Sequence, residues 1–330
     1  MFFNLVMMGT LITLSAYSWF SMWIGLEINL LSIIPLFKSN TNNYPAEATL
    51  KYFITQALAS TMILFTILLS MNMNEFIPMH FNYWMMIILN SALLTKLGAA
   101  PFHAWFPEVS EGLNWSNNLL LMTWQKLAPM ILIMYNIHMT LFFSLIILFS
   151  AIISGIYGLN QTSLRKIMTY SSINHMAWML ASMMNFQMIW LIYFIIYSLM
   201  VFNVIIYFWL MNIFYLNQLF LMMNSNKLIK LMFIFNFFSL GGLPPLLGFL
   251  PKWLTLNFLI NNNFFTLSVI LILFTLLTLY FYIRITLSSL TITYNEILIK
   301  TSTLNNFIIV ILNIITLLSL IICTNLFNFM

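Results

Sequence analysis

The chain of 330 residues consists of long apolar runs separated by short polar or Pro- and Gly-containing connections. Most runs approach the ~20 residues that an α-helix needs to cross the hydrocarbon core of a bilayer. Backbone groups in lipid must be hydrogen-bonded within the protein, and these runs are too continuous for barrel strands, so the pattern predicts transmembrane helices. The eleven predicted spans are 3–19, 20–37, 50–70, 82–100, 117–135, 139–160, 167–185, 187–211, 230–257, 264–288 and 304–326.

Composition supports a membrane protein. Hydrophobic residues make up 62% of the chain and charged residues 5%, against about 25% charged residues in soluble domains. Such a chain has too little polar surface to cover a globule in water. We therefore expect an all-α polytopic membrane protein of about eleven transmembrane helices, with almost nothing left for a soluble domain. The apolar N-terminus is expected to be a retained first span and not a removed signal.

Basic residues are distributed unequally between the two alternating sets of connections. Eight fall on one side: Lys38, Lys51, Arg165, Lys166, Lys227, Lys230, Arg284 and Lys300. The opposite connections, near 19, 71–81, 136–140, 185–187 and 258–263, contain none. By the positive-inside rule, this asymmetry predicts an odd number of spans, with the N-terminus on the positive side and the C-terminus opposite. Five glutamates fall in connections and are expected to be solvated: Glu47, Glu75, Glu108, Glu111 and Glu296.

Four charged residues fall inside or beside apolar spans: Glu27, Lys96, Lys126 and Lys252. An ionisable group at mid-membrane costs about 2.5–3.5 kcal/mol on insertion scales, so such residues are usually functional. Glu27 and Lys96 lie on nearby early spans and form the obvious candidate pair. Lysines in such places are candidates for proton exchange. The alternative is that each lysine extends to the interface and keeps its charge in water.

His175 lies among Ser171, Ser172 and Asn174 inside an apolar span. Histidine titrates near neutral pH and suits proton relay, although a hydrogen-bonded packing role is equally compatible with this sequence. The other histidines, His80, His103 and His138, are expected to be structural or interfacial. Several polar residues in the spans are expected to bond helices together or to line water; they are Asn29, Thr55, Gln56, Ser60, Thr123, Gln125 and Asn203.

Several kinds of chemistry are excluded. The chain contains no Asp and no phosphate-loop, dinucleotide or H-E-x-x-H motif. The single Cys323 excludes an intrachain disulfide, an iron–sulfur ligand set and a Cys-based zinc site, and the four dispersed histidines do not form a metal site. The net charge of +5 comes from scattered residues and not from a nucleic-acid-binding patch.

Two spans contain strong helix breakers. The first has Gly98, Pro101 and Pro107, and the second has Gly241, Gly242, Pro244, Pro245, Gly248 and Pro251. These spans are five apart, as expected for inverted five-helix repeats of the transporter type; unrelated kinks are the alternative. We expect a first repeat over 1–137, a second over 138–288, and a C-terminal connection and last helix over 289–330. Pro129 predicts a third local weakening, beside Lys126.

Six segments together resemble one known family. They are W-I-G-L-E-I-N-L-L-S-I-I-P, E-A-T-L-K-Y-F-I-T-Q-A-L-A-S, L-T-K-L-G-A-A-P-F-H-A-W-F-P-E-V, T-W-Q-K-L-A-P, G-L-N-Q-T-S-L-R-K-I-M-T-Y-S-S-I-N-H-M-A-W and G-G-L-P-P-L-L-G-F-L-P-K-W. In this order they resemble the subunit 2 family of NADH dehydrogenase (ubiquinone) in mitochondrial respiratory complex I, over about residues 19–285. The Met, Asn, Phe and Ile content is typical of an invertebrate mitochondrial gene. Residues 288–330 match no motif of the family.

The resemblance implies an antiporter-like membrane-arm subunit in which a line of mid-membrane charges moves protons. The family's intramembrane Glu falls on Glu27, its broken-helix lysines on Lys96 and Lys252, and its central lysine on Lys126. Its mid-membrane His region falls on His175. The chain itself would then bind no cofactor, because NADH, FMN, the iron–sulfur clusters and ubiquinone belong to other subunits.

The implied partners are other membrane-arm subunits and membrane lipids such as cardiolipin, with no nucleic acid. The implied location is the mitochondrial inner membrane, with the N-terminus in the matrix and the C-terminus in the intermembrane space. Two other functions remain compatible with the residues. One is an autonomous cation/proton antiporter, and the other is a membrane scaffold whose lysines bind lipid or neighbouring helices.

Overall fold

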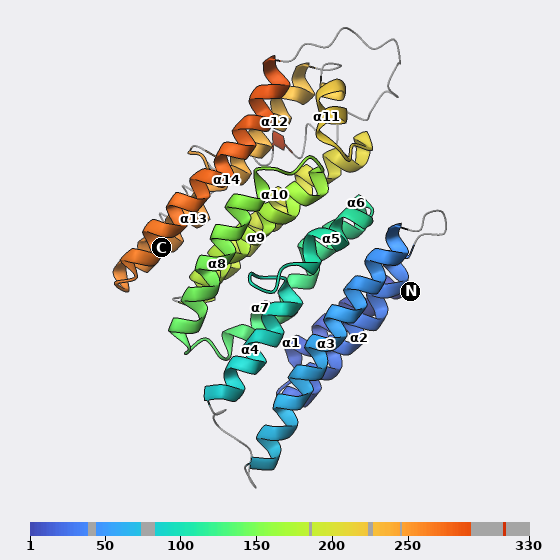
Figure 1. Cartoon of the computed structure of the whole chain (residues 1–330), viewed down its shortest axis with the longest axis vertical. Coiled ribbons are helices and arrows are strands. Elements are labelled where there is room, and N and C mark those ends of the chain that lie inside the picture. The colour runs from blue at the N-terminus through green and yellow to red at the C-terminus, as the bar shows by residue number, and fades with distance from the viewer. Residues whose placement is uncertain are drawn as a thin grey trace. The chain divides into compact units, whose positions relative to one another are not determined.

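The computed structural model describes residues 1–38, 44–73, 83–184, 187–223, 227–244, 246–291 and 313–314. In these residues the regular elements are α-helices, together with one isolated bridge between Ser163 and Tyr215. The expected all-α class is therefore confirmed. The chain divides into two compact units, Met1–Ile146 and Ile147–Met330. In each unit the long helices run side by side (Figure 1).

The first unit is built around four long helices and three short ones. The helices are α1 (Phe2–Ser15), α2 (Trp19–Phe37), α3 (Tyr44–Met73), α4 (Tyr83–Leu97), α5 (Trp105–Gly112), α6 (Trp115–Met122) and α7 (Trp124–Met134). Helix α2 packs between α1 and α3, and α3 also contacts α4 and α5. Helix α7 packs against α1 and α4. Helix α8 (Thr140–Gly158) begins in this unit and continues into the second.

Helices α1 and α2 approach each other closely because glycines face each other at their crossing. A Cβ on Gly25 would lie 2.8 Å from the backbone nitrogen of Thr13, and one on Gly9 would lie 2.9 Å from that of Asn29. Helix α2 begins at the N-cap Ser18, whose hydroxyl accepts a hydrogen bond from the Ser21 amide. This crossing determines the position of the next turns of α2. These turns carry Glu27 and Asn29.

The second unit surrounds a central helix, α9 (Leu164–Met183), in which every side chain from Ile167 to Met183 is buried. The other helices are α10 (Gln187–Met211), α11 (Leu216–Met223), α12 (Lys227–Gly241), α13 (Phe249–Asn261) and α14 (Phe265–Thr291). Helices α10, α13 and α14 all pack against α9. An aromatic cluster of Tyr207, Phe208, Phe233, Phe237 and Tyr282 joins α10, α12 and α14.

The predicted apolar runs from 3–19 to 264–288 all contain helix. Five described helices are long and apolar enough to cross a membrane unaided: α2, α3, α8, α10 and α14. Of the run 304–326 only Asn313 and Ile314 are described, and the Asn236 amide donates to Asn313 Oδ1 at 2.6 Å. Predictions for Glu75, His80, Pro245, Glu296, Lys300 and Cys323 lie outside the described residues.

Two segments predicted as connections contain short helices. Helix α5 forms within 101–116, where Trp105, Phe106 and Val109 bury one face and leave Glu108 outside. Helix α11 forms within 212–229. An amphipathic helix of eight residues is too short to produce a clear periodic signal, so the sequence pattern missed both.

The local weakening predicted beside Lys126 lies just before that residue. Pro129 lies inside α7, whereas the helix is interrupted at Thr123, between α6 and α7. At Thr123 the backbone has φ −112° and ψ −73°. The amide of Lys126 then bonds to the carbonyl of Thr123 at 3.3 Å, three residues back and not four. The irregular turn therefore comes just before Lys126.

Candidate functional site

The three lysines predicted to lie in the membrane are buried inside the protein. Lys126 is 2% exposed, and Lys96 and Lys252 are each 7% exposed. A lysine that extended to the interface would instead expose its end. Glu27 is half-buried, and its buried Oε1 atom has no hydrogen-bond partner among the described residues. These positions are consistent with groups placed for use within the bundle.

Lys96 lies in the last turn of α4, beside a small cavity of about 20 Å³. The cavity is large enough for one water molecule, which also needs two to four polar partners. Its walls supply them, since Lys96, Tyr52, Gln56, Asn29 and Gln125 all line it. Gln56 also donates its side-chain amide to the Lys96 carbonyl at 3.2 Å, which joins α3 to α4. The cavity therefore offers Lys96 a polar surrounding inside the bundle.

An amide pair connects this cavity to the helix that carries Lys126. Asn29 Nδ2 donates to Gln125 Oε1 at 3.1 Å, and Gln125 Nε2 donates to Asn29 Oδ1 at 2.9 Å. The pair joins α2 to α7, and Gln125 directly precedes Lys126. The prediction that these polar residues bond helices together is confirmed for this pair.

Lys126 occupies an aromatic surrounding. Its Nζ atom lies over the Phe106 ring, 5.5 Å from the centroid, a geometry typical of cation–π attraction. Phe106 belongs to α5, the short helix after the first break. The sequence did not identify Phe106 as a partner of Lys126. Phe106 lies on α5, a short helix that the hydrophobic pattern did not predict.

The structure does not bring the expected pair, Glu27 and Lys96, into direct contact. The two ion pairs formed among the described residues both involve Lys51, on α3. Opposite charges on Glu27 and Lys96 would still attract each other through space, without a fixed hydrogen bond.

Both broken helices end in the same backbone motif. After α4, the amide of Ala99 bonds to the Leu94 carbonyl and that of Gly98 to the Thr95 carbonyl. After α12, the amide of Leu243 bonds to the Phe238 carbonyl and that of Gly242 to the Ser239 carbonyl. This pattern is the Schellman motif, which requires a left-handed residue directly after the helix. Gly98 (φ 74°) and Gly242 (φ 77°) supply it.

Lys252 reaches back from α13 to the end of α12. Its Nζ atom donates to the Gly241 carbonyl at 2.9 Å. The C-terminal end of a helix carries partial negative charge, which favours a cation there. A Cβ on Gly242 would lie 2.9 Å from both Cδ and Nζ of Lys252. Gly242 therefore provides both the left-handed turn and the space for the lysine.

His175 belongs to a buried polar group in the second unit. Its Nδ1 atom lies 2.9 Å from the Tyr193 hydroxyl, and the Tyr197 ring lies 5.1 Å from the imidazole ring between centroids. The side-chain amide of Asn174, the residue directly before His175, donates to the Thr278 hydroxyl at 3.1 Å. Sequence reasoning missed Tyr193, which follows His175 by 18 residues on a different helix. Among the described residues, no three His, Cys, Asp or Glu side chains form a metal-binding group.

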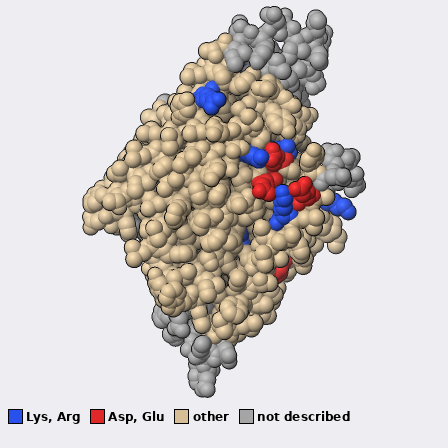
Figure 2. Space-filling model, viewed as in Figure 1, with Lys and Arg blue, Asp and Glu red and all other residues tan. Residues whose placement is uncertain are grey.

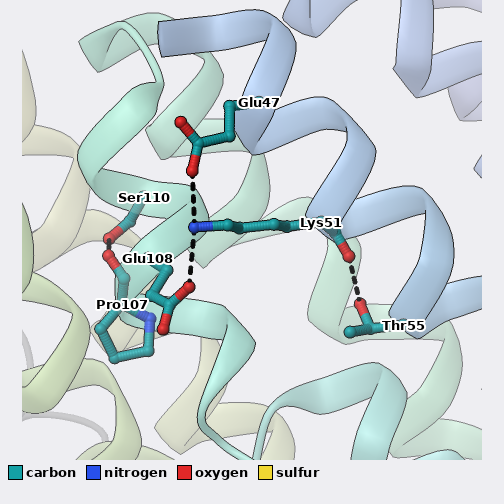
Figure 3. Close-up of polar contacts among 6 residues, drawn as sticks. All are labelled: Glu47, Lys51, Thr55, Pro107, Glu108 and Ser110. Carbon is teal, nitrogen blue, oxygen red and sulfur yellow. Dashed lines mark hydrogen bonds and ion pairs between the residues drawn. The ribbon is translucent and has the colours of Figure 1, made fainter.

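A charged cluster lies at the N-terminal ends of α3 and α5 (Figure 3). Lys51 Nζ lies 2.8 Å from Glu47 Oε1 and 3.0 Å from Glu108 Oε2, and all three side chains are well exposed. Charged residues are rare on the face shown in Figure 2, where most of the surface is uncharged. The prediction that Glu47, Glu108 and Glu111 lie in connections is wrong, because all three lie on helices. The prediction that they are solvated is confirmed for Glu47 and Glu108.

A family profile and individual relatives both match proteins of NADH–quinone oxidoreductases. The profile described as NADH:quinone oxidoreductase/Mrp antiporter, transmembrane, matches residues 16–278. A relative from Anopheles gambiae named NADH-ubiquinone oxidoreductase chain 2 is 48% identical over 296 residues, 89% of this chain and 86% of the relative. A relative of the same name from Locusta migratoria is 44% identical over 340 residues, 100% of this chain and 96% of the relative.

Solved structures share the fold at low sequence identity. A chain of respiratory complex I from Thermus thermophilus has a TM-score of 0.85 at 22% identity, covering 96% of this chain and 76% of its own length. A chain of an Mrp complex from a Dietzia species has a TM-score of 0.74 at 14% identity. The match covers 85% of this chain and 58% of the Dietzia chain. These matches establish an antiporter-like membrane fold.

Proposed function

The chain belongs to the NADH-ubiquinone oxidoreductase chain 2 family, and from this membership we propose that Glu27, Lys96, Lys126 and Lys252 form its proton pathway. As a member of this family it is a membrane-arm subunit of respiratory complex I, the enzyme that couples electron transfer from NADH to ubiquinone with proton translocation. The observation that best supports the pathway is the polar connection between Lys96 and the helix of Lys126.

The first step places a proton on Lys96. The Glu27 carboxylate attracts the Lys96 ammonium through space, and the unpartnered Glu27 Oε1 can accept a hydrogen bond. When Glu27 is charged it favours the protonated lysine, and when Glu27 is neutral this attraction is lost. Glu27 therefore acts as a gate for the charge on Lys96.

The second step moves the proton from Lys96 toward Lys126. The 20 Å³ cavity beside Lys96 has room for one water, and Asn29 and Gln125 form part of its wall. Amide side chains both donate and accept hydrogen bonds, so they can orient such a water. Lys126 receives the proton as an ammonium, which the Phe106 ring stabilises.

The third step involves Lys252 and the second unit. Its ammonium is held by the Gly241 carbonyl at the end of α12, and α13 packs against α9, the helix of His175. We assign His175 and Tyr193 to proton relay in this unit, since their 2.9 Å contact joins two groups that can each donate and accept a proton. Packing alone is the other interpretation of His175.

The finer architecture follows the same proposal. We infer eleven spans in two inverted five-helix repeats, 1–137 and 138–288, followed by a last helix within 289–330. The shared motif at Gly98 and Gly242 supports this relation between the two halves. The proposed location is the mitochondrial inner membrane, with the N-terminus in the matrix and the C-terminus in the intermembrane space. The proposed partners are other complex I subunits, which hold the redox cofactors, and membrane lipids such as cardiolipin.

Two other functions were compatible with the sequence. An autonomous cation/proton antiporter is not favoured, because the relatives at 44–48% identity are complex I subunits. A scaffold whose lysines only hold helices together predicts that removing their charge harms assembly more than coupling. The effect of replacing one buried lysine therefore separates the scaffold from the relay.

Replacing Lys126 by Met tests the relay directly. Met keeps an unbranched chain of similar length and removes the charge, and an apolar group replacing a buried charge is commonly tolerated. We expect the complex to assemble at normal levels and to pump fewer protons per electron or turn over more slowly. The measurement is proton uptake against NADH oxidation in vesicles containing the purified complex.

Lys38→Met is the matched control, because Lys38 is exposed outside the helices and its replacement should change neither quantity. An assembled Lys126→Met complex with wild-type pumping and turnover would count against the relay. Loss of the assembled complex together with normal coupling in the remainder would support the scaffold.

A further inference from the structure

A pocket of about 690 Å³ opens at one end of the second unit. Its volume lies within the range of small-molecule sites, roughly 300–1,000 Å³. The pocket is lined by the end of α8, the connection into α9, the start of α11 and the last turns of α14. Glu27, Lys96, Lys126, Lys252 and His175 are not among its lining residues. The pocket is therefore separate from the proposed proton pathway.

Backbone hydrogen bonds fix the rim of this pocket. The amide of Leu216 donates to the Thr162 carbonyl at 3.2 Å, and the amide of Leu164 donates to the Phe214 carbonyl at 2.9 Å. The Arg165 guanidinium also lies over the Phe214 ring, 4.8 Å from its centroid. The two connections that border the pocket are thus tied together, and the pocket belongs to the folded unit.

The polar part of the pocket suits an anion. Arg284 is an exposed lining residue, and neither ion pair among the described residues involves it. Asn160, Gln161, Thr162, Asn217 and Ser288 are further polar lining residues, and no carboxylate is present among the lining residues that the structure describes. Arginine with neighbouring amides and hydroxyls is well matched to a phosphate group.

The apolar part suits acyl chains. Phe220, Phe281 and Ile285 line the same pocket. Next to it along α8 and α14, the side chains of Ile156, Tyr157, Tyr280 and Leu287 are exposed. Exposed apolar side chains at this position offer an acyl chain a matching surface. The pocket therefore connects a cationic polar region to an apolar surface, which an inorganic phosphate ion would not use.

We propose that this pocket binds the anionic headgroup of a phospholipid, with the phosphate at Arg284 and the acyl chains along the exposed faces of α8 and α14. The site lies at the end of the unit where α9 begins, with Arg165 and Lys166 in its first turn, and where Arg284 lies near the end of α14. These three cations belong to the positively charged side of the predicted topology, which attracts anionic lipid. The lipid completes the surface of the second unit and takes no part in proton transfer.

Photo-crosslinking of the whole purified complex in lipid nanodiscs tests the proposal. The probe is phosphatidylglycerol with a photoactivatable group in its acyl chain, and labelled peptides are identified by mass spectrometry. We expect labelling of the peptides around 156–162 and 280–288. Arg284→Gln should reduce this labelling about tenfold, as expected for loss of a charge-assisted contact. Lys38→Gln, which removes an exposed charge outside the pocket, should leave it unchanged.

Two further measurements keep the test decisive if Arg284→Gln fails to assemble. Asn217→Trp fills the pocket while retaining Arg284, and should also abolish labelling there. A phosphatidylcholine probe should label these peptides much less, and excess inorganic phosphate should not compete. Equal labelling by the neutral lipid, competition by phosphate alone, unchanged labelling in both variants, or crosslinks to another subunit lying in the pocket would each overturn the proposal.

Discussion

At the scale of single residues, the candidate site depends on uncharged residues as much as on the lysines. These are a glycine and two side-chain amides. Lys252 can donate to the Gly241 carbonyl because Gly242 leaves space for it. Lys96 has a polar cavity because Asn29 and Gln125 hold each other's amides at its wall. The function of a buried charge therefore depends on its neutral neighbours.

Gly242→Ala should affect both stability and coupling. A left-handed backbone costs a residue with a Cβ about 1–2 kcal/mol, and the new Cβ would displace Lys252 from the Gly241 carbonyl. We expect a lower thermal inactivation temperature of the complex and fewer protons pumped per electron.

Gly155→Ala is the matched control for this change. Gly155 lies in α8, where a Cβ would meet Phe274 at an ordinary 3.4 Å. Alanine favours helix over glycine by up to about 1 kcal/mol, so this variant should be as stable as the wild type or slightly more so. A Gly242→Ala complex that matched Gly155→Ala in both measurements would contradict the assigned role of Gly242.

The sequence alone located the buried charges but not their partners. Charge is so scarce in this chain that Lys96, Lys126 and Lys252 could be selected by position, and all three are buried. The Phe106 contact and the Tyr193 contact join residues on different helices. One sequence does not show which helices pack together, so it could not predict these contacts or exclude direct contact between Glu27 and Lys96.

At the scale of elements, the breaks determine where the charged groups lie. The short helix α5 follows the first break and carries both Phe106, over Lys126, and Glu108, paired with Lys51. A long apolar run is visible in a sequence, so the main helices were predicted. The interruption at Thr123 and the helices α5 and α11 depend on tertiary packing over one or two turns, which hydrophobic periodicity does not resolve.

Glu108→Gln tests whether the charged cluster holds α5 in place. The change removes the ion pair between α5 and Lys51, while Glu47 and Lys51 remain paired on α3. We expect faster hydrogen exchange over 105–112 and little change in overall stability, since exposed ion pairs contribute weakly. The effect should shrink at high salt.

Glu47→Gln is the control, because it removes an ion pair within α3 and leaves the contact to α5 intact. Exchange over 105–112 should stay at the wild-type rate. Equal protection of α5 in wild type and in Glu108→Gln would show that apolar packing of Trp105 and Phe106 is sufficient.

At the scale of the whole molecule, the proposed topology rests on which ends of the helices carry basic residues. Arg165 and Lys166 lie in the first turn of α9 and Arg284 lies near the end of α14, and Ile167 and Arg284 line the same pocket at one end of the second unit. This agrees with their assignment to one side of the membrane. The five helices that are apolar enough to span unaided do not decide the number of spans, because broken and polar helices are missed by such a criterion.

Cysteine labelling can test the orientation. Asn160 and His138 are exposed residues in connections that the topology places on opposite sides. A membrane-impermeant thiol reagent added to mitoplasts, whose outer membrane has been removed, should label His138→Cys. Asn160→Cys should react only in inverted inner-membrane vesicles. The parental chain with Cys323 alone provides the background, and the reverse pattern would invert the proposed topology.

The burial of α9 has a consequence for how this chain enters the membrane. Although α9 has 20 residues, it is not among the helices apolar enough to cross a membrane unaided. Its serines, Asn174 and His175 would be costly to expose to lipid. In the folded unit α10, α13 and α14 cover it. Insertion of α9 is therefore expected to depend on helices that are synthesised later. A chain ending at Met184 would expose a polar helix to lipid, without the helices that bury it in the folded unit.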